Sequence, residues 1–365
     1  MTTVVLAAAI ANRQGLGGSI WVRRSWATAL QRLGFEVFLV DKLTPDGTRE
    51  AFAEAMNELG VEGALLDGDT VHGCERRELL DRLDAAALLV NLGGHLRDRE
   101  LLRRPQVRAF VDLDPGYTQI WHAQGHDVGL AGHDHYFSVG ANVGARSWTL
   151  PSGDVDWHSI RQPVVLEDWP VSEEDFTSFT TVGSWRGAFG PVEWHGRSYG
   201  PKAHQFRRFA TLPETVGLPF EATLAIDAAD ARDRELLESG GWRLRNPGDV
   251  ATTAGFARYV STSGAEFSPA QDVYVSTASG WFSDRTVRYL ASGRPAVVQD
   301  TTLERALPIG DGLLTFRTAS EAADRALDVV ARYETHRRAA RAIAEEFFSP
   351  EAALAPLFDA TGVAP

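Results

Sequence analysis

The sequence is poor in cysteine and contains no long apolar run. Its single cysteine, Cys74, excludes an intramolecular disulfide and a cysteine-built metal cage, so a cytoplasmic location is the expected default. No apolar stretch reaches the roughly 20 residues needed to cross a bilayer, which predicts no membrane span. The apolar start, residues 4–10, lacks a basic segment before it, so we expect a first strand there and not a signal peptide.

Lysine is also scarce, and the chain as a whole is acidic. The formal net charge is −13 over 365 residues, which argues against nucleic acid as a partner because phosphate backbones require a basic surface. Lys42 and Lys202 are the only lysines beside 34 arginines, a bias typical of GC-rich genomes such as those of actinobacteria. Lys202, kept against that bias, is a candidate ligand for an anion. The alternative is an ordinary solvated surface lysine.

Apolar strands alternate with amphipathic helices in both halves of the chain, and we find no repeat or low-complexity tract. Such alternation predicts an α/β fold with a parallel, doubly wound sheet in each half. Expected strands in the first half are residues 4–10, 35–40, 61–66, 86–91, 107–113 and 136–139. In the second half they are residues 178–184, 221–226, 242–245, 296–298 and 313–316. A single helix is expected over residues 201–211. We expect domains over residues 1–165 and 166–345, followed by a terminal helical segment over 346–365.

The most informative stretch is residues 279–301, which predicts a loop, a helix, a turn and a buried strand. Ser283 is the expected N-cap of the helix, whose first amide groups then face whatever lies in front of it. Arg285 and Thr286 lie in the first turn, so an anion is favoured there, and a diphosphate is the common biological one. Asp300 and Thr301 follow the strand, at the end where open α/β sheets bind ligands.

This helix, its Gly-x-Pro turn at 293–295 and the next strand resemble the nucleotide-sugar half of GT-B glycosyltransferases. The resemblance implies two Rossmann-like domains facing a cleft, with the acceptor in the first, the donor in the second and the last helix crossing back to the first. Many retaining members carry two glutamates eight residues apart here, whereas this chain has Gly280 and Arg288. The carboxylate contacts to sugar and ribose are therefore absent or come from elsewhere.

The resemblance and the residue types together give an expected donor site. The diphosphate ligands would be Lys202, Arg285, Ser283, Thr286, Arg197, Gly17 and Gly18. Contacts to the sugar or nucleoside would come from Glu266, Asp284, Asp300 and Thr301. Lys202 and Arg285 together would neutralise the leaving group, so we expect neither a metal nor another cofactor. We expect Arg285→Ala to abolish transfer with little loss of fold.

The loop at residues 15–19 follows the first strand and opens a helix, so its glycines allow close approach of a ligand. Ile20 stands where the third glycine of a dinucleotide fingerprint belongs, which disfavours a nicotinamide-dependent oxidoreductase. A purely structural turn is the alternative. In GT-B enzymes the equivalent loop lies near the donor phosphates, which is why Gly17 and Gly18 are candidates.

Two polar loops follow neighbouring strands of the first half and supply the candidate general bases. His95 ends one loop, and Asp112 and Asp114 lie in the next. A histidine or carboxylate there can take the proton from an acceptor hydroxyl. His95 and Asp114 are the two leading candidates. The alternatives are backbone hydrogen bonding for His95 and turn formation for the two aspartates, since Asp-Pro-Gly is a strong turn former.

Histidines are concentrated over residues 122–135. His133 and His135 have the spacing of one strand face, but no third ligand has familiar spacing, so we expect no metal site.

The sequence therefore predicts a glycosyltransferase that moves a sugar from a nucleotide-sugar donor to a hydroxyl or amine of a small-molecule acceptor, in actinobacterial natural-product biosynthesis. The alternatives are a nucleotide-sugar epimerase of the same fold, which needs no acceptor, and a non-catalytic protein that binds a nucleotide or sugar. The oligomeric state is left open.

Overall fold

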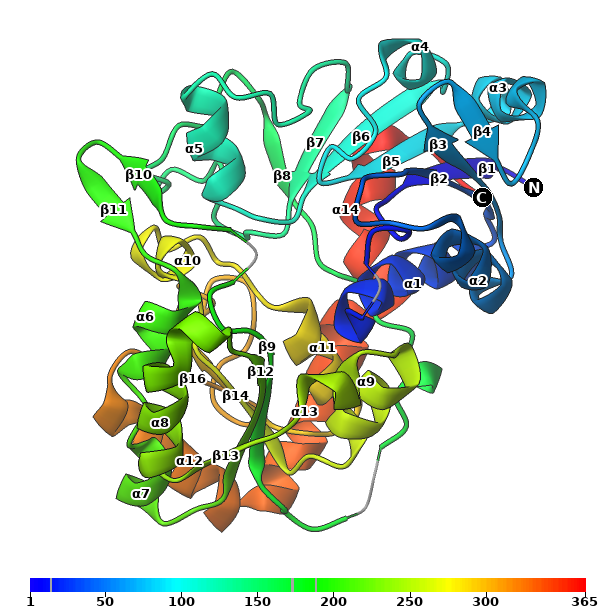
Figure 1. Ribbon diagram of the computed structural model, residues 1–365. Coiled ribbons are helices and arrows are strands. Elements are labelled where there is room, and N and C mark those ends of the chain that lie inside the picture. Colours follow the sequence, from blue (N-terminus) through cyan, green and yellow to red (C-terminus); the bar gives the residue numbers. More distant parts are fainter. Residues whose placement is uncertain (14, 172–173, 188) are drawn as a thin grey trace. The chain divides into compact units, whose positions relative to one another are not determined.

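The computed structural model describes residues 1–13, 15–171, 174–187 and 189–365 (Figure 1). Internal contacts divide the chain into two compact units. Unit 1 comprises residues 1–146, 150–165 and 348–365, and unit 2 comprises residues 147–149 and 166–347. Unit 1 is therefore built from both ends of the chain.

Unit 1 contains a sheet with the strand order β4-β3-β2-β1-β5-β6-β7-β8, in which every pairing is parallel except that of β3 with β4. Its strands are β1 (Thr3–Ala7), β2 (Glu36–Lys42), β3 (Glu62–Asp67), β4 (Thr70–His72), β5 (Leu88–Leu92), β6 (Val107–Asp112), β7 (His135–Ser138) and β8 (Trp157–Ser159). Its helices are α1 (Gly17–Arg32), α2 (Arg49–Leu59), α3 (Arg76–Ala85), α4 (Arg99–Leu102), α5 (Tyr117–Ala123) and α14 (Pro350–Thr361).

Helices cover both faces of this sheet. Leu79 and Leu83 of α3 join the buried cluster that includes Val5 of β1 and Phe38 of β2. Helices α1 and α2 lie on the opposite side of the strands (Figure 1), and α14 packs against α1, β6 and β7. The buried strands are thus apolar on both faces, as expected for a parallel sheet.

Helix α2 shows how local signals set the boundaries of an element. The Thr48 side chain accepts a hydrogen bond from the Ala51 amide at the start, and Gly60 ends the helix in the left-handed conformation at φ 62°. Phe52, Ala55 and Met56 between these caps are buried. Their spacing gives one apolar stripe toward the core.

Unit 2 contains a wholly parallel sheet with the order β13-β12-β9-β14-β15-β16 and a separate hairpin, β10-β11. The strands are β9 (Phe179–Ser184), β10 (Val192–Trp194), β11 (Arg197–Tyr199), β12 (Phe220–Ala225), β13 (Trp242–Leu244), β14 (Ala265–Ser268), β15 (Ala296–Gln299) and β16 (Leu313–Phe316). The α-helices are α6 (Lys202–Arg207), α7 (Leu212–Val216), α8 (Ala231–Ser239), α9 (Thr253–Ser261), α10 (Asp272–Ser276), α11 (Asp284–Ala291), α12 (Ala319–Ala331) and α13 (Tyr333–Phe348). Short 3₁₀ helices are η1 (Leu166–Asp168), η2 (Ala228–Asp230) and η3 (Pro247–Val250).

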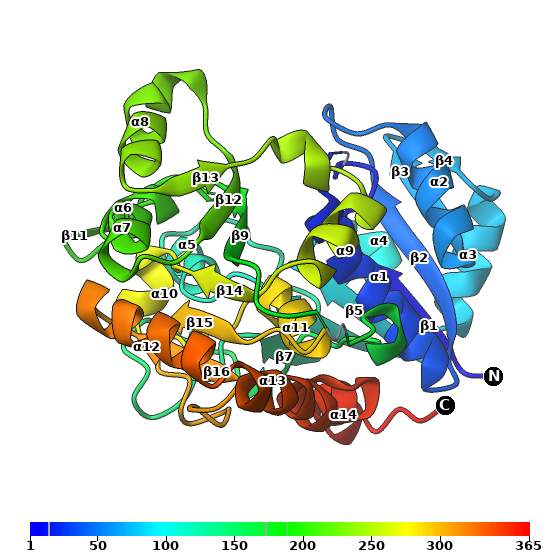
Figure 2. The same ribbon diagram turned by 90° about the horizontal axis from the view of Figure 1, so that it is seen from below.

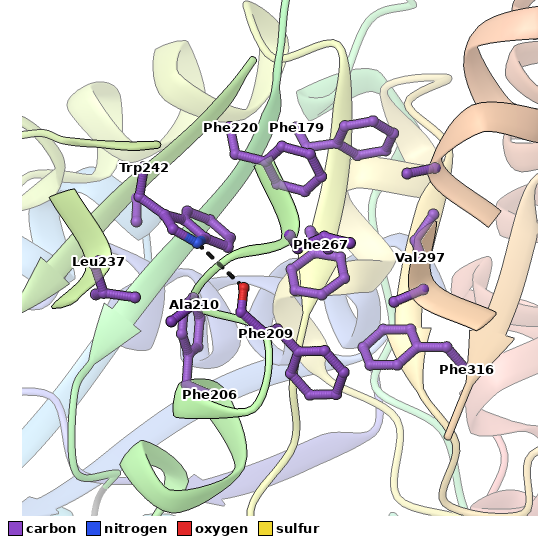
Figure 3. Packing of buried hydrophobic residues seen from close by; sticks show 14 of the residues in the cluster. Phe179, Phe206, Phe209, Ala210, Phe220, Leu237, Trp242, Phe267, Val297 and Phe316 are labelled. Carbon is purple, nitrogen blue, oxygen red and sulfur yellow. Dashed lines mark hydrogen bonds between the residues drawn. The ribbon is translucent and has the colours of Figure 1, made fainter. Parts of the chain in front are cut away.

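One face of the second sheet carries an aromatic core (Figure 3). The Phe179 and Phe220 rings stack with centroids 4.7 Å apart, and those of Phe267 and Phe316 at 5.0 Å. The Trp242 indole donates to the Phe209 carbonyl oxygen at 3.3 Å. Helices α6, α7, α8 and α12 lie on this side and α9 and α11 on the other (Figure 2). Because side chains alternate along a strand, the neighbours of these aromatic residues face α11.

The predicted α/β fold with two parallel, doubly wound sheets is confirmed. Two element predictions are wrong. The single helix expected over residues 201–211 is shorter, ends at Arg207 and is followed by a separate α7. Residues 265–268, not predicted as a strand, form β14 between β9 and β15. Helix α5 and strands β4 and β8 were also not predicted.

Acid is expected to weaken unit 2 through His336. This histidine is fully buried, and its Nδ1 accepts a hydrogen bond from the Gly312 amide at 3.0 Å. Burial, aided by nearby Arg332, lowers the pKa of His336 below its usual 6.5. The unfolded chain therefore takes up a proton first as the pH falls below 6.5, and stability is lost in that range. His336→Asn keeps a hydrogen-bond acceptor but does not titrate. Urea unfolding should therefore show that the free energy of unfolding falls less between pH 7.5 and pH 5 in this variant than in the wild type. An equal fall in both proteins would contradict this prediction.

Candidate functional site

Arg285 lies in the first turn of α11 and is held by three groups from the sheet. Its Nε donates to Glu266 Oε1 at 2.6 Å, its Nη1 to the Val182 carbonyl at 2.8 Å and its Nη2 to Ser268 Oγ at 2.5 Å. These partners lie at the carboxyl ends of β9 and β14. Burial alone would lower the pKa of Arg285, but the Glu266 carboxylate raises it overall. The guanidinium is thus a fixed, charged group.

Lys202 opens α6 and meets Arg285 beside Gly183, near the end of β9. A methyl group added at Gly183 would lie 3.4 Å from Lys202 Nζ and 3.7 Å from Arg285 Nη1. Lys202 is only 8% exposed, and its ammonium has no hydrogen-bond or ion-pair partner within the described residues. Burial, together with the nearby Arg285 charge, lowers the pKa of Lys202 from 10.5 to about 7. The Lys202 amino group and the Arg285 guanidinium, distant in sequence, therefore both lie beside Gly183.

The start of α11 adds polar groups next to Arg285. Ser283 is the N-cap residue, as expected, but its side chain makes no capping hydrogen bond. Thr286 is 1% exposed, and its hydroxyl is without a partner among the residues that the structure describes. Both residues line a small cavity together with Ser268, Trp281 and Gln299. Hydroxyl groups and a helix N-terminus favour an oxyanion at such a place.

The remaining predicted donor residues have other partners. Glu266 is fully buried against Arg285. Asp300 pairs with Arg317 at 2.6 Å, and the Thr301 hydroxyl donates to the Trp281 carbonyl at 2.8 Å. These side chains stabilise the structure around the site. Two further predicted ligands also contact neighbouring side chains. Asp284 pairs with Arg288 at 2.8 Å, and the Arg197 guanidinium on β11 stacks over the Tyr199 ring at 4.9 Å.

Unit 1 carries a second cluster, formed by His95 and Asp41. The distance from His95 Nε2 to Asp41 Oδ1 is 2.6 Å. Asp41 is 1% exposed, and its Oδ2 accepts from the amides of Ile10 and Ala11 at 2.8 and 2.7 Å. A carboxylate only accepts, so we assign the imidazole proton to Nε2. This leaves His95 Nδ1 as the basic nitrogen, and it has no partner within the described ranges.

The amide of Lys42 lies near both members of this cluster. It donates to Asp41 Oδ1 at 2.6 Å and lies 3.1 Å from His95 Nε2. The shorter contact is to a charged acceptor, so the amide is satisfied by Asp41 and does not require an unprotonated Nε2.

Asn91, at the end of β5, fixes the loop that presents His95. Its Oδ1 accepts from the Leu96 amide at 3.0 Å, and its Nδ2 lies 2.8 Å from the Leu96 carbonyl and 3.1 Å from His133 Nε2. Burial lowers the pKa of His133. Its Nδ1 lies 3.1 Å from the Leu130 carbonyl oxygen and donates to it, so Nε2 accepts from Asn91. Asp41 and Asn91 were not predicted, although each is a polar residue at the end of an expected strand.

Asp112 lies in a hydrogen-bonded turn, which was the expected alternative to its role as a general base. It is fully buried, and Thr118 Oγ1 at 2.6 Å and Ser138 Oγ at 2.8 Å donate to its two oxygens. The Asp114 amide and Gln119 Nε2 donate as well, at 2.9 and 3.0 Å. Burial raises the pKa of Asp112, and these donors oppose the rise. Asp114 follows in the same turn and is partly exposed.

Gly17 and Gly18, expected within the loop over residues 15–19, are the first residues of α1. The preceding residue, Leu16, offers no side-chain cap. The first amides of α1 therefore belong to glycines, which present bare backbone to any ligand placed before them.

Two neighbouring glycines in the His95 loop give a matched pair of variants. Gly93 and Gly94 have φ values of 64° and 62°, but only at Gly94 would a Cβ meet the Val128 carbonyl oxygen, at 2.6 Å. Both alanine variants pay about 1 kcal/mol for the left-handed conformation. We expect Gly94→Ala to cost at least about 1 kcal/mol more, from overpacking. Urea unfolding measures both, and equal losses would show that the loop relaxes freely.

Within the described residues, no group of three or more potential ligands is arranged to hold a metal ion. None of the helices in that part of the chain has the length and apolarity to cross a membrane.

The two doubly wound sheets and their order define the GT-B type of glycosyltransferase fold, and solved glycosyltransferases match over nearly the whole chain. Sucrose-phosphate synthase from Thermosynechococcus elongatus has 12% identity and a TM-score of 0.60, covering 99% of this chain and 98% of that chain. HepE from Anabaena, with UDP and glucose, has 12% identity and a TM-score of 0.57, covering 99% and 100%.

An α-glucosyltransferase in complex with UDP and a 13-mer DNA has 10% identity and a TM-score of 0.61, covering 100% of both chains. No family model matches the sequence, and no curated protein matches it. At these identities the likeness establishes the fold.

Proposed function

We propose that this protein is a glycosyltransferase that uses a nucleotide sugar as donor. The observation that carries the proposal is the pair formed by Lys202 and Arg285 around Gly183. A diphosphate between them would meet a fixed guanidinium and an ammonium that has no other partner in the described structure. Ser283 and Thr286 at the start of α11 would supply further donors. The solved structures of similar fold that contain UDP support this choice of ligand.

His95 is the general base of the proposed reaction. The acceptor hydroxyl would give its proton to Nδ1 as its oxygen bonds to the anomeric carbon. The bond from that carbon to the diphosphate breaks, and its electron pair leaves with the diphosphate. Asp41 would stabilise the imidazolium that forms. In this mechanism Asp112 and Asp114 would stabilise the turn after β6 and would not take the proton. Glu266 would orient Arg285 without touching the sugar. Lys202 and Arg285 would balance the leaving charge, so no metal or other cofactor is part of this mechanism.

The acceptor of the proposed reaction is a small molecule with a hydroxyl or amine, of the natural-product kind. The net charge of −13 opposes binding to nucleic acid and favours this choice over DNA. The single cysteine fits a reducing, cytoplasmic compartment.

Calorimetric titration with UDP, dTDP and GDP, with and without magnesium, tests the donor site. We expect micromolar binding of one nucleotide, unaffected by magnesium. The matching nucleotide sugar should then release its nucleotide in the presence of hydroxylated small molecules, detected by mass spectrometry of the product. Isomerised donor without an acceptor would indicate an epimerase. Binding without turnover over a broad acceptor panel would favour a binding protein, and no binding to any nucleotide would refute the proposal.

A further inference from the structure

The charges around Gly183 do not balance. Arg285 is neutralised by Glu266, whose Oε1 lies 2.6 Å from the guanidinium. Lys202, almost as deeply buried, has no such partner in the described parts of the chain. Glu266 raises the pKa of Lys202 less than burial and Arg285 lower it. A buried charge without a partner is costly, so burial favours the neutral form of Lys202.

The other charged side chains on the surrounding elements have hydrogen-bond or ion-pair partners other than Lys202. On α6, the Arg207 guanidinium pairs with Asp233 at 2.7 Å, and in the loop after β9 Arg186 pairs with Asp230 at 2.7 Å. On α10, Asp272 accepts from Gln205 at 3.0 Å and from Ser276 at 2.7 Å. On α11, Asp284 pairs with Arg288. Arg285 and Glu266 are therefore the charged groups that act on Lys202 in the described structure.

We propose that this site takes up a proton together with its ligand, because a diphosphate supplies the charge partner that the buried Lys202 side chain lacks beside Arg285. The identity of the ligand rests on the proposed function. The geometry that supports the inference is a buried amino group without a partner in the described residues, which lies with the fixed Arg285 guanidinium beside Gly183. An anion there supplies the missing partner.

The size of the effect follows from the acidity of Lys202. With a pKa of about 7, roughly nine-tenths of the Lys202 side chains are neutral at pH 8. A bound diphosphate returns the pKa toward the ordinary value of about 10.4, so uptake approaches one proton per site. The terminal phosphate of UDP loses its second proton near pH 6, so UDP itself contributes little at pH 8. Pyrophosphate still carries one proton at pH 8, so the slope near one is expected for UDP. Apparent affinity should fall about tenfold per pH unit above pH 7, following this linkage.

Calorimetry with UDP and with inorganic pyrophosphate tests the inference. Titrations at pH 8 in buffers of different ionisation enthalpy give the number of protons taken up as the slope of enthalpy against buffer enthalpy. We expect a slope near one for the wild type. Lys202→Arg keeps a cation that does not titrate in this range, so its slope should be near zero and its affinity constant from pH 7 to 9. Lys42→Arg changes the only other lysine, which is exposed, and should retain the wild-type slope.

The two probes separate this inference from the proposed function. UDP binding with a slope near zero in the wild type would overturn proton uptake and leave the donor site intact. Uptake with pyrophosphate but no binding of any nucleotide would support the proton-linked anion site and refute the transferase. If neither probe binds, both proposals fail. Thermal unfolding of each variant establishes that it is folded before titration.

Discussion

Replacing Arg285 with alanine is expected to lower the free energy of unfolding by about 3–5 kcal/mol, since it leaves the buried Glu266 charge unpaired. The sequence alone suggested that this change would remove transfer with little loss of fold. The contact with Glu266 at 2.6 Å revises that expectation. Urea unfolding at pH 7.5 provides the measurement, and nucleotide binding should be lost in the same variant.

A double variant separates the structural from the functional role of Arg285. Arg285→Met with Glu266→Gln removes both charges, so part of the stability should return while nucleotide binding remains absent. Arg24→Ala breaks the more exposed pair with Glu58 and is the matched control, with an expected loss below about 1 kcal/mol. The assignment fails if Arg285→Ala is as stable as the wild type and still binds the nucleotide.

Replacing His95 with glutamine is expected to lower kcat by about 10²- to 10⁴-fold, the usual contribution of a general base. Donor affinity should not change, because the proposed donor ligands are on unit 2. Asp41→Asn should lower kcat as well, since an amide at this position favours the wrong imidazole tautomer. Steady-state transfer with an acceptor from the screen measures kcat, and calorimetry measures the donor Kd.

His126→Ala provides the control for the His95 experiment. His126 belongs to the same unit and is exposed, so its replacement should leave kcat unchanged. If His95→Gln lowers only the donor affinity and leaves kcat unchanged, His95 is not the general base. Asp114 would then be the remaining candidate.

The fold was predictable because its signals are local. Alternating apolar segments indicated both parallel sheets, and the caps Thr48, Gly60 and Ser349 mark helix ends within a few residues of their own sequence. Strand β14 was not predicted because Glu266 and Ser268 make its sequence polar. Those side chains are buried and bind Arg285, a contact that no local pattern reveals.

The candidate site was predictable only where its residues carry a local signal in the sequence. Lys202 stands out by the scarcity of lysine, and Arg285 by its position at a helix start. That these two meet beside Gly183 follows from the order of strands in the sheet and could not be read from the sequence. Asp41 was missed because its partner His95 lies 54 residues further on. Only the adjacency of the ends of β2, β1 and β5 explains that pairing.

The return of α14 to unit 1 has a consequence for biosynthesis on the ribosome. Helix α14 packs on α1, β6 and β7, and Phe358 stacks on Phe35 with ring centroids 4.9 Å apart. The surface that receives it is translated first, yet the helix emerges only after the whole of unit 2. The nascent first unit therefore keeps an uncovered apolar strip for most of translation. Apart from residues 147–149, unit 2 is one continuous segment over residues 166–347, so it can complete its core earlier.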